Sequence, residues 1–280
     1  MKFKYYGTAA AEAVPALFCE CDVCTNARKK GGRNIRTRSQ ALVDDKILID
    51  FPPDTYLHVL MYGLPLHKIS TCIITHNHSD HLCPSEIFMR HKIFSHLKDN
   101  KPFSIYGTQA VIDVIRNTRG LCEYIDSMIK DGEIELHTIK KFEPFYVEDF
   151  KITAVSADHG AKDPVIYMIE KDGKSMLYAH DTGLFPDDTI AYLENIDICF
   201  DFVSFDCTNV LLELDNRGHM GITGNEIMRE KLKRMGRIDE HTKCVINHFS
   251  HNGLAGYDEL VSMAQEREFD IAYDTMEFDI

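Results

Sequence analysis

The sequence predicts an α/β protein in which mixed β-sheets are covered by helices. Three observations support this prediction. Short apolar runs bounded by turn residues recur along the 280-residue chain, and they have the length of strands. The early runs follow one another closely, as in hairpins, whereas helical patterns separate the later runs. No run rich in Pro, Gly or Ser divides the chain, so we expect a single domain over residues 1–280.

The expected elements follow from these patterns in chain order. Strands are predicted at residues 2–6, 39–43, 46–50, 70–74, 103–106, 134–138, 150–155, 164–170, 174–179, 199–205, 243–247 and 270–273. Helices are predicted at residues 54–62, 85–97, 108–130, 187–195, 224–235 and 257–267. Thr223 and Glu226 have the spacing of a capping box, which marks the start of the fifth helix.

The composition limits the classes of partner. With 31 basic and 44 acidic residues, the formal charge is −13 at pH 7, which argues against general capture of a nucleic-acid backbone. The sequence shows no charged leader followed by an apolar run, and no apolar stretch of the ~18 residues that suggest a membrane span. We therefore expect a cytoplasmic protein that acts on a small substrate without membrane or nucleic-acid partners. A homodimer is the default assembly.

The strongest chemical signal is the segment 75–81, with the sequence THNHSDH, at the end of the predicted strand 70–74. It concentrates three imidazoles and one carboxylate, those of His76, His78, Asp80 and His81. Neutral imidazole nitrogen and carboxylate oxygen suit zinc, iron or manganese. The segment therefore predicts a metal site, with a solvated histidine-rich turn as the alternative.

A pair of metals needs further ligands, and these should lie at strand ends elsewhere in the chain. Three segments qualify. His159 follows the predicted strand 150–155, Asp181 follows the strand 174–179, and His248 follows the strand 243–247. Each is a weak signal alone, but their conjunction with the segment 75–81 predicts a composite site.

The order of these residues resembles the metallo-β-lactamase superfamily, whose signature is His-x-His-x-Asp-His followed by a His, an Asp and a His on later strand-end loops. Asp50 matches the first, structural aspartate of that family. The resemblance covers residues 50–248 and implies a four-layer αβ/βα sandwich, with the metals at one edge between the sheets. A carboxylate at Asp181, where many antibiotic-degrading relatives have a thiolate, is similar to the phosphodiester and thioester branch of the family.

The resemblance also implies a ligand set. It assigns His76, His78 and His159 to a first metal, and Asp80, His81 and His248 to a second, with Asp181 as the bridge. The metals expected are zinc or manganese, with iron and nickel as alternatives. His180 should point to the opposite face of the extended chain, so we interpret it as a supporting residue.

A second cluster lies near the N-terminus, where Cys19, Cys21 and Cys24 offer three thiolates, one short of a closed zinc site. His251 is the candidate for the fourth ligand. We interpret residues 19–38 as a structural zinc loop whose basic segment 28–38 is solvated, with contact to an anionic substrate as the alternative role of that segment. Three thiols grouped by chance are the alternative to the zinc site. The cysteine cluster, together with the His-x-x-His pair of His248 and His251, resembles the phosphoribosyl 1,2-cyclic phosphate phosphodiesterase subfamily of phosphonate degradation.

That subfamily also carries a histidine before the last metal ligand, and His219, between Gly218 and Met220, fits this position. We expect His219 to contact the phosphate and to transfer a proton to the leaving oxygen. Asp80 is both a ligand and an acceptor for the proton of the nucleophile. The same segment and the cysteine triad also resemble cofactor-biosynthesis proteins of the pyrroloquinoline quinone pathway. Asp206 ends a predicted strand and is interpreted either as a supporting residue or as an ordinary strand terminus.

The expected function is therefore that of a dinuclear metal-dependent hydrolase. The leading interpretation is a phosphodiesterase that cleaves a small, cyclic or linear phosphodiester by attack of a metal-bridging hydroxide. The alternatives are a thioester or lactone hydrolase of the same superfamily and a non-hydrolytic accessory protein of cofactor biosynthesis. A transfer RNA processing nuclease is disfavoured, because the chain has no long, flexible arm rich in Gly and Pro.

The remaining cysteines and histidines have no motif context. Six cysteines are expected to be reduced core thiols, namely Cys72, Cys83, Cys122, Cys199, Cys207 and Cys244. Six histidines are expected on the surface or on helix faces, namely His58, His67, His91, His96, His137 and His241.

Overall fold

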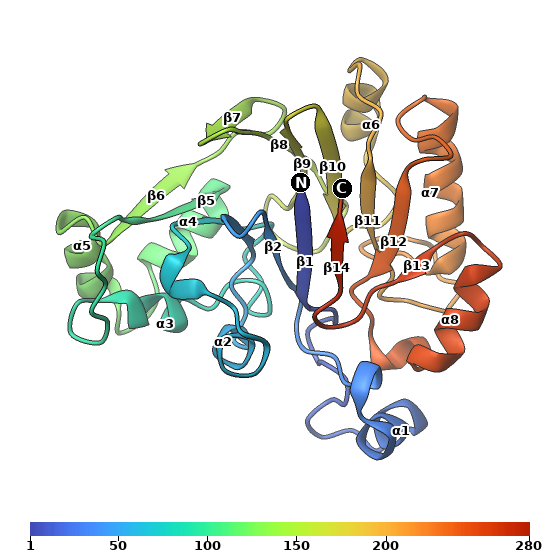
Figure 1. The fold of residues 1–280 in the computed structure, drawn as a ribbon, viewed down its shortest axis with the longest axis horizontal. Coiled ribbons are helices and arrows are strands. Elements are labelled where there is room, and N and C mark those ends of the chain that lie inside the picture. The colour runs from blue at the N-terminus through green and yellow to red at the C-terminus, as the bar shows by residue number, and fades with distance from the viewer.

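The computed structural model describes residues 1–280 apart from the side chain of Gln265. Within that part of the chain, two seven-stranded sheets pack together and helices cover their outer faces (Figure 1). Helices α2 to α5 lie beside the first sheet, and α6, α7 and α8 lie beside the second. This arrangement confirms the predicted αβ/βα sandwich.

The first sheet has the strand order β14-β1-β2-β3-β4-β5-β6. Strands β3 to β6 run parallel to one another, whereas β14, β1, β2 and β3 pair antiparallel. The strand bounds are β1 Lys2–Gly7, β2 Gln40–Val43, β3 Ile47–Ile49, β4 Thr71–Ile73, β5 Phe103–Gly107, β6 Ile134–Thr138 and β14 Glu277–Asp279. The helices of this half are α2 Thr55–Tyr62, α3 Pro84–Ile87, α4 Gln109–Arg116 and α5 Cys122–Lys130.

The second sheet has the order β13-β12-β11-β10-β9-β8-β7. Strands β10 to β13 are parallel, so their carboxyl ends meet at one edge of the sheet. The strand bounds are β7 Pro144–Val147, β8 Phe150–Ser156, β9 Val165–Lys171, β10 Lys174–Ala179, β11 Phe202–Asp206, β12 Lys243–Asn247 and β13 Asp270–Ile271. The helices are α6 Asp187–Glu194, α7 Ile222–Arg234 and α8 Tyr257–Gln265.

Two hydrophobic clusters hold these layers together. The larger joins the two sheets through fully buried residues such as Phe3, Ile49 and Tyr167, and it continues beneath α6, α7 and α8. The smaller lies between the first sheet and α4 and α5, around residues such as Ile105 and Val111. Burial of each such side chain contributes roughly 1.5–3 kcal/mol, which fixes the sheets whose edges carry the site.

The structure corrects several sequence predictions. An unpredicted helix, α1 Asp22–Lys30, lies within residues 19–38, so the first basic residues of that segment are helical rather than part of a solvated loop. The helix predicted at 85–97 ends as α3 and a 3-10 turn at Arg90. The helix predicted at 108–130 is broken near Gly120, where φ is +79°.

The start of α7 was also predicted wrongly. The N-cap is Gly221 and Thr223 lies inside the helix, so Thr223 and Glu226 do not form the predicted capping box. The short edge strands β7 and β14 were not predicted, and β11 begins at Phe202 rather than at residue 199.

Burial contradicts some predictions for single residues. Cys122 and Cys199 are exposed rather than core thiols, and Cys83 is half-buried. His91 is buried rather than on the surface, and His58 lies in helix α2 as expected but is fully buried. In the part of the chain that the structure describes, no helix combines the length and the apolar character needed to cross a bilayer.

Candidate metal centre

The candidate metal centre lies where loops from both sheets meet. The loop after β4 carries His76 to His81, and the loops after β8, β10 and β12 carry His159, Asp181 and His248. Because β10 and β12 are in one parallel set, their carboxyl ends deliver Asp181 and His248 to the same edge.

The backbone at this edge is locally strained. Asp50, Asp181 and His248 have φ of 65°, 52° and 63°, a left-handed conformation that is unfavourable for residues other than glycine. Such residues persist where the surrounding structure holds them, and they are concentrated at functional sites. These three lie at the ends of β3, β10 and β12, next to the clustered donors.

The structure brings the predicted donors together in two groups. The ligand atoms of His76, His78 and His159 all lie within 4.8 Å of one another, and Nδ1 of His78 is 3.1 Å from Nε2 of His159. The ligand atoms of Asp80, His81 and His248 form the second group within the same limit. Each group therefore has the size of a single-ion site.

Asp181 lies between the two groups. Its Oδ2 is 2.9 Å from Nε2 of His81 and 3.0 Å from Nε2 of His248, both in the second group. Its Oδ1 faces the first group, at 3.5 Å from Nε2 of His159. The two oxygens of one carboxylate thus face different donor groups.

Each of two imidazoles is oriented by a hydrogen bond from the ring nitrogen that faces away from the centre. Nδ1 of His81 donates to Oδ2 of the fully buried Asp50 at 2.8 Å. Nδ1 of His159 lies 3.1 Å from the carbonyl oxygen of Gly218, to which it can only donate. In the neutral ring, each bond places the proton on Nδ1 and leaves Nε2 available as a ligand atom.

Two further imidazoles, those of His76 and His248, follow the same pattern through hydroxyl groups. Nδ1 of His76 is 3.0 Å from Oγ1 of Thr75, which itself donates to Asp50. Nδ1 of His248 is 2.8 Å from Oγ1 of Thr208. Asp50 therefore supports two imidazoles of the centre, one directly and one through Thr75.

The inward-facing atoms have the properties that a cation requires. Nε2 of His76 and Oδ2 of Asp181 are buried without a hydrogen-bond partner among the described residues. Nε2 of His81 and Nε2 of His248 lie only 3.3 Å apart. Unpaired buried acceptors are unfavourable, and facing lone pairs repel, so a shared divalent cation fits this donor set.

The charges around the centre also favour a bound cation. Burial lowers the pKa of His76 well below its usual range. Burial opposes ionisation of Asp181, yet His248 and His81 hold the pKa of its carboxyl well below the usual value. Burial disfavours the charged form of His81 too, but Asp181 and Asp50 raise its pKa well above the ordinary value. Excess negative charge therefore surrounds His81, where a cation would be stabilised.

His219 lies beside the centre and is supported by Asp206. Its Nδ1 donates to Oδ2 of Asp206 at 3.0 Å, and its ring centroid is 4.8 Å from that of His159. Burial disfavours the charged imidazole, but the Asp206 carboxylate outweighs this effect and raises the pKa of His219 to about 9.

Asp206 is fully buried and connects several parts of the site. It accepts hydrogen bonds from the backbone amides of Asp181 at 3.0 Å and Met220 at 3.0 Å, and from the amide of Thr208 at 3.1 Å. This network favours the supporting role over that of an ordinary strand terminus.

His180 lies outside the donor groups. Its Nε2 is 2.7 Å from Oγ of Ser204 and its Nδ1 is 3.3 Å from Oγ of Ser39, which occupies both ring nitrogens inside the protein. The side chain is fully buried. Its position agrees with the alternation expected along the extended segment.

A cavity of about 330 Å³ opens beside the two groups. Its lining includes metal-ligand candidates and His219, together with Glu12, Asn209, Leu212, Ser250 and Asn252. Glu12 and its partners were not predicted from the sequence. Glu12 has no motif context, and its contact with Ser250 joins residues 238 positions apart, so no local signal could have revealed it.

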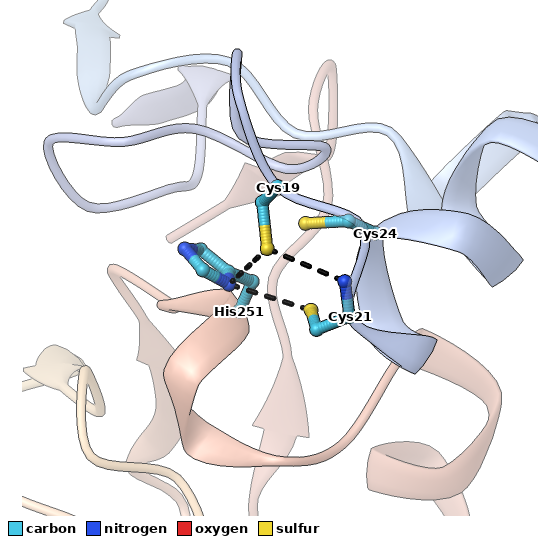
Figure 2. Close-up of side chains that lie close together, drawn as sticks. All are labelled: Cys19, Cys21, Cys24 and His251. Atoms are coloured by element: carbon cyan, nitrogen blue, oxygen red, sulfur yellow. Dashed lines mark hydrogen bonds between the residues drawn. The ribbon is translucent and has the colours of Figure 1, made fainter.

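The predicted cysteine cluster is also assembled. Cys19, Cys21, Cys24 and His251 have donor atoms within 4.8 Å of one another, and Figure 2 shows them converging from the N-terminal segment and from the turn after β12. Nδ1 of His251 lies 3.5 Å from Sγ of Cys19 and 3.5 Å from Sγ of Cys21. Three sulfurs and one imidazole nitrogen are the donor set of a structural zinc site.

The fold and the donor groups define the class of metallo-β-lactamase-fold hydrolases, which bind divalent metals. The chain belongs to the β-lactamase superfamily, because residues 46–248 match the model of the Beta-lactamase superfamily domain.

Solved structures and a sequence relative agree with this membership. A diphosphatase from the PhnP family has a TM-score of 0.75 at 20% identity, covering 100% of this chain and 97% of that one. Zn²⁺-bound PqqB from Methylobacterium extorquens has a TM-score of 0.77 at 21% identity, covering 100% of both chains. Coenzyme PQQ synthesis protein B from Methylobacterium radiotolerans is 24% identical over 157 residues, which are 51% of this chain and 48% of that protein. The match therefore spans about half of that relative's length.

Proposed function

We propose that the protein is a dinuclear metal-dependent phosphodiesterase that acts on a small phosphodiester. The observation that carries the proposal is the position of Asp181, whose two oxygens face the two donor groups at the wall of a cavity. One ion would be held by His76, His78 and His159. The other ion would be held by Asp80, His81 and His248, and Asp181 would contact both ions. Two divalent ions held there lower the pKa of a shared water and polarise phosphoryl oxygens.

The chain's own residues complete the proposed chemistry. His219 lines the cavity, and its hydrogen bond to Asp206 orients the ring and favours its protonated form. A protonated imidazole at this place can donate to a phosphoryl oxygen or deliver its proton to the departing oxygen. Asp80, half-buried at the cavity wall, can accept the proton of the attacking water.

The similarity to a PhnP-family diphosphatase supports the phosphoryl chemistry. The similarity to PqqB, seen in both sequence and structure, supports a second candidate, a non-hydrolytic accessory role in cofactor biosynthesis. A thioester or lactone hydrolase would use the same donor groups, because a polarised carbonyl can replace the phosphoryl group.

A paired turnover assay separates these functions. The metal-replete protein is tested on bis(p-nitrophenyl) phosphate and on an acyl thioester, with the Asp181→Ala variant as the control for contaminating activity. We expect turnover of the diester that is lost in the variant. Turnover of the thioester alone would establish the carbonyl hydrolase, and no turnover of either substrate would favour the accessory role.

We also propose that Cys19, Cys21, Cys24 and His251 hold a structural zinc ion. The cluster joins the N-terminal segment to the turn after β12, and its four members are not among the residues that line the cavity. Elemental analysis of the purified protein tests this, with a third metal per chain expected beyond the two of the centre.

A further inference from the structure

The lining of the cavity also includes a carboxylate that is not a metal-ligand candidate, that of Glu12. Oε1 of Glu12 accepts hydrogen bonds from Oγ of Ser250 at 2.5 Å and from Nδ2 of Asn252 at 3.1 Å. These bonds fix the side chain, which is 31% exposed, at the rim of the cavity. Oε2 receives no hydrogen bond from the described residues, so it is free to bind a donor on a ligand.

Among the described residues, no Lys or Arg side chain pairs with this carboxylate. Among the described residues that line the cavity, none is Lys or Arg. Arg38 lies near the same loop, but its Nε donates to the carbonyl oxygen of Ala11 at 2.6 Å and its Nη1 pairs with Asp54 at 3.2 Å. His251 is the nearest imidazole, with Nε2 at 3.8 Å from Oε1 of Glu12.

A second cationic side chain, that of Arg217, is not part of the cavity lining. Arg217 precedes Gly218 in the loop that carries His219, but it is 80% exposed and pairs with Asp215 at 3.3 Å. The cavity therefore offers cationic partners to one phosphoryl group, at the metal centre and His219. A second anionic group on the substrate would lie against Glu12 instead.

We propose that Glu12 selects the substrate class: a phosphodiester with one anionic phosphoryl group, whose other ester substituent carries hydroxyl or ammonium donors. This inference rests on the proposed phosphodiesterase function. Glu12 binds the donor groups through Oε2 and repels a second phosphate, and like charges a few ångströms apart at a partly buried site cost roughly a factor of ten or more in binding. A phosphoribosyl cyclic phosphate, which carries a second phosphate, does not match this lining.

The test uses two substrates that differ by one phosphate. The p-nitrophenyl ester of thymidine 5′-phosphate is compared with the same ester carrying an additional 3′-phosphate, so leaving group and reaction are identical. We expect the metal-replete protein to favour the singly charged ester by at least tenfold in kcat/KM. The Glu12→Gln variant should reduce this preference to about threefold or less, because the amide keeps the bonds to Ser250 and Asn252 but lacks the charge.

Two further variants serve as controls. Glu123→Gln removes an exposed acidic residue on α5 that does not line the cavity, and should leave the preference at its native value. Glu12→Asp retains the charge and should retain most of the preference. A native preference for the doubly phosphorylated ester, or an unchanged preference in Glu12→Gln, would overturn the inference and leave the phosphodiesterase proposal intact.

A binding measurement decides the matter without turnover. Calorimetric titration compares thymidine 5′-phosphate with thymidine 3′,5′-bisphosphate on the metal-replete protein and on Glu12→Gln. We expect the native protein to bind the monophosphate more tightly than the bisphosphate. In Glu12→Gln, the difference in affinity between the two nucleotides should be smaller. If neither ester is hydrolysed, the proposed function fails, and this titration still determines whether Glu12 discriminates against a second phosphate.

Discussion

Oδ2 of Asp206 accepts a hydrogen bond from Nδ1 of His219 at 3.0 Å, while the same carboxylate accepts the backbone amide of Asp181. One buried side chain thus positions both the proposed proton donor and the proposed bridging ligand. Asp206 lies at the end of β11, between the strands that carry Asp181 and His248.

His219→Ala should slow turnover by about two to four orders of magnitude, the usual range for loss of a general acid, with the metal content unchanged. Asp206→Asn should slow turnover less, because the ring remains but loses its carboxylate partner. Steady-state kinetics and elemental analysis check both variants, with the exposed His241→Ala as the control. Full activity in His219→Ala would remove this residue from the mechanism.

Asp181→Ala should lose bound metal and turnover together, because its carboxylate faces both donor groups. We expect the loss of at least one metal per chain and turnover that is slower by about three orders of magnitude or more, as expected for loss of metal-ion catalysis. Asp197→Ala, an exposed aspartate after α6, is the matched control. A variant that keeps both metals would show that Asp181 is not the bridge.

Cys21→Ser should remove the third metal and leave the two at the cavity in place. Since metal binding contributes to folding stability, we expect the melting temperature to fall by roughly 5 °C or more. The exposed Cys122→Ser tests the effect of losing a thiol elsewhere. If elemental analysis still finds three metals in Cys21→Ser, the cluster is not the structural site.

Acidification should destabilise the protein through His58. Burial lowers the pKa of His58 to about 4, so between about pH 6.5 and 4 the unfolded chain binds a proton that the folded chain does not. Stability from this group is complete above that range and is lost as the pH falls, by about 2 kcal/mol at pH 5. Urea unfolding at pH 7 and pH 5 should show that the free energy of unfolding falls less for His58→Gln than for the native protein.

Asp274 should change the stability in the opposite direction as the pH falls, so a variant of this residue is the control for the urea experiment. It shares the hydroxyl of Thr37 with His58, and burial raises its pKa to about 6, so the folded chain binds its proton first and gains stability as the pH falls. Asp274→Asn should therefore lose more stability than the native protein between pH 7 and pH 5. If the native protein and His58→Gln lost the same stability between pH 7 and pH 5, His58 would not be the cause of the acid destabilisation.

The sequence predicted most strands because their apolar character is local. It also predicted the seven proposed ligands of the centre, since strand ends such as those before His159 and His248 carry their own signal. It missed α1, where charged residues after Cys21 gave no apolar periodicity. It missed β14 because this three-residue edge strand depends on pairing with β1 at the other end of the chain.

The contacts of the residues that support the site could be identified only from the structure. Asp50 was recognised by its place in a motif, but its bonds to His81 and Thr75 became visible only in three dimensions. Glu12 had no signal, because its partners Ser250 and Asn252 are brought beside it by the whole fold. Side chains that a site recruits across long chain separations cannot be read from local patterns.

The cysteine cluster imposes an order on biosynthesis. Its thiols and His251 lie far apart in the chain, and Cys21 and His251 are separated by 230 positions. At roughly 5–20 residues per second, Cys21 leaves the ribosome about 10 to 50 s before the histidine that completes the set. During that interval the nascent N-terminal thiols lack the fourth proposed ligand and are open to oxidation or to other metal ions, so loading of the proposed zinc site requires that they stay reduced until translation ends.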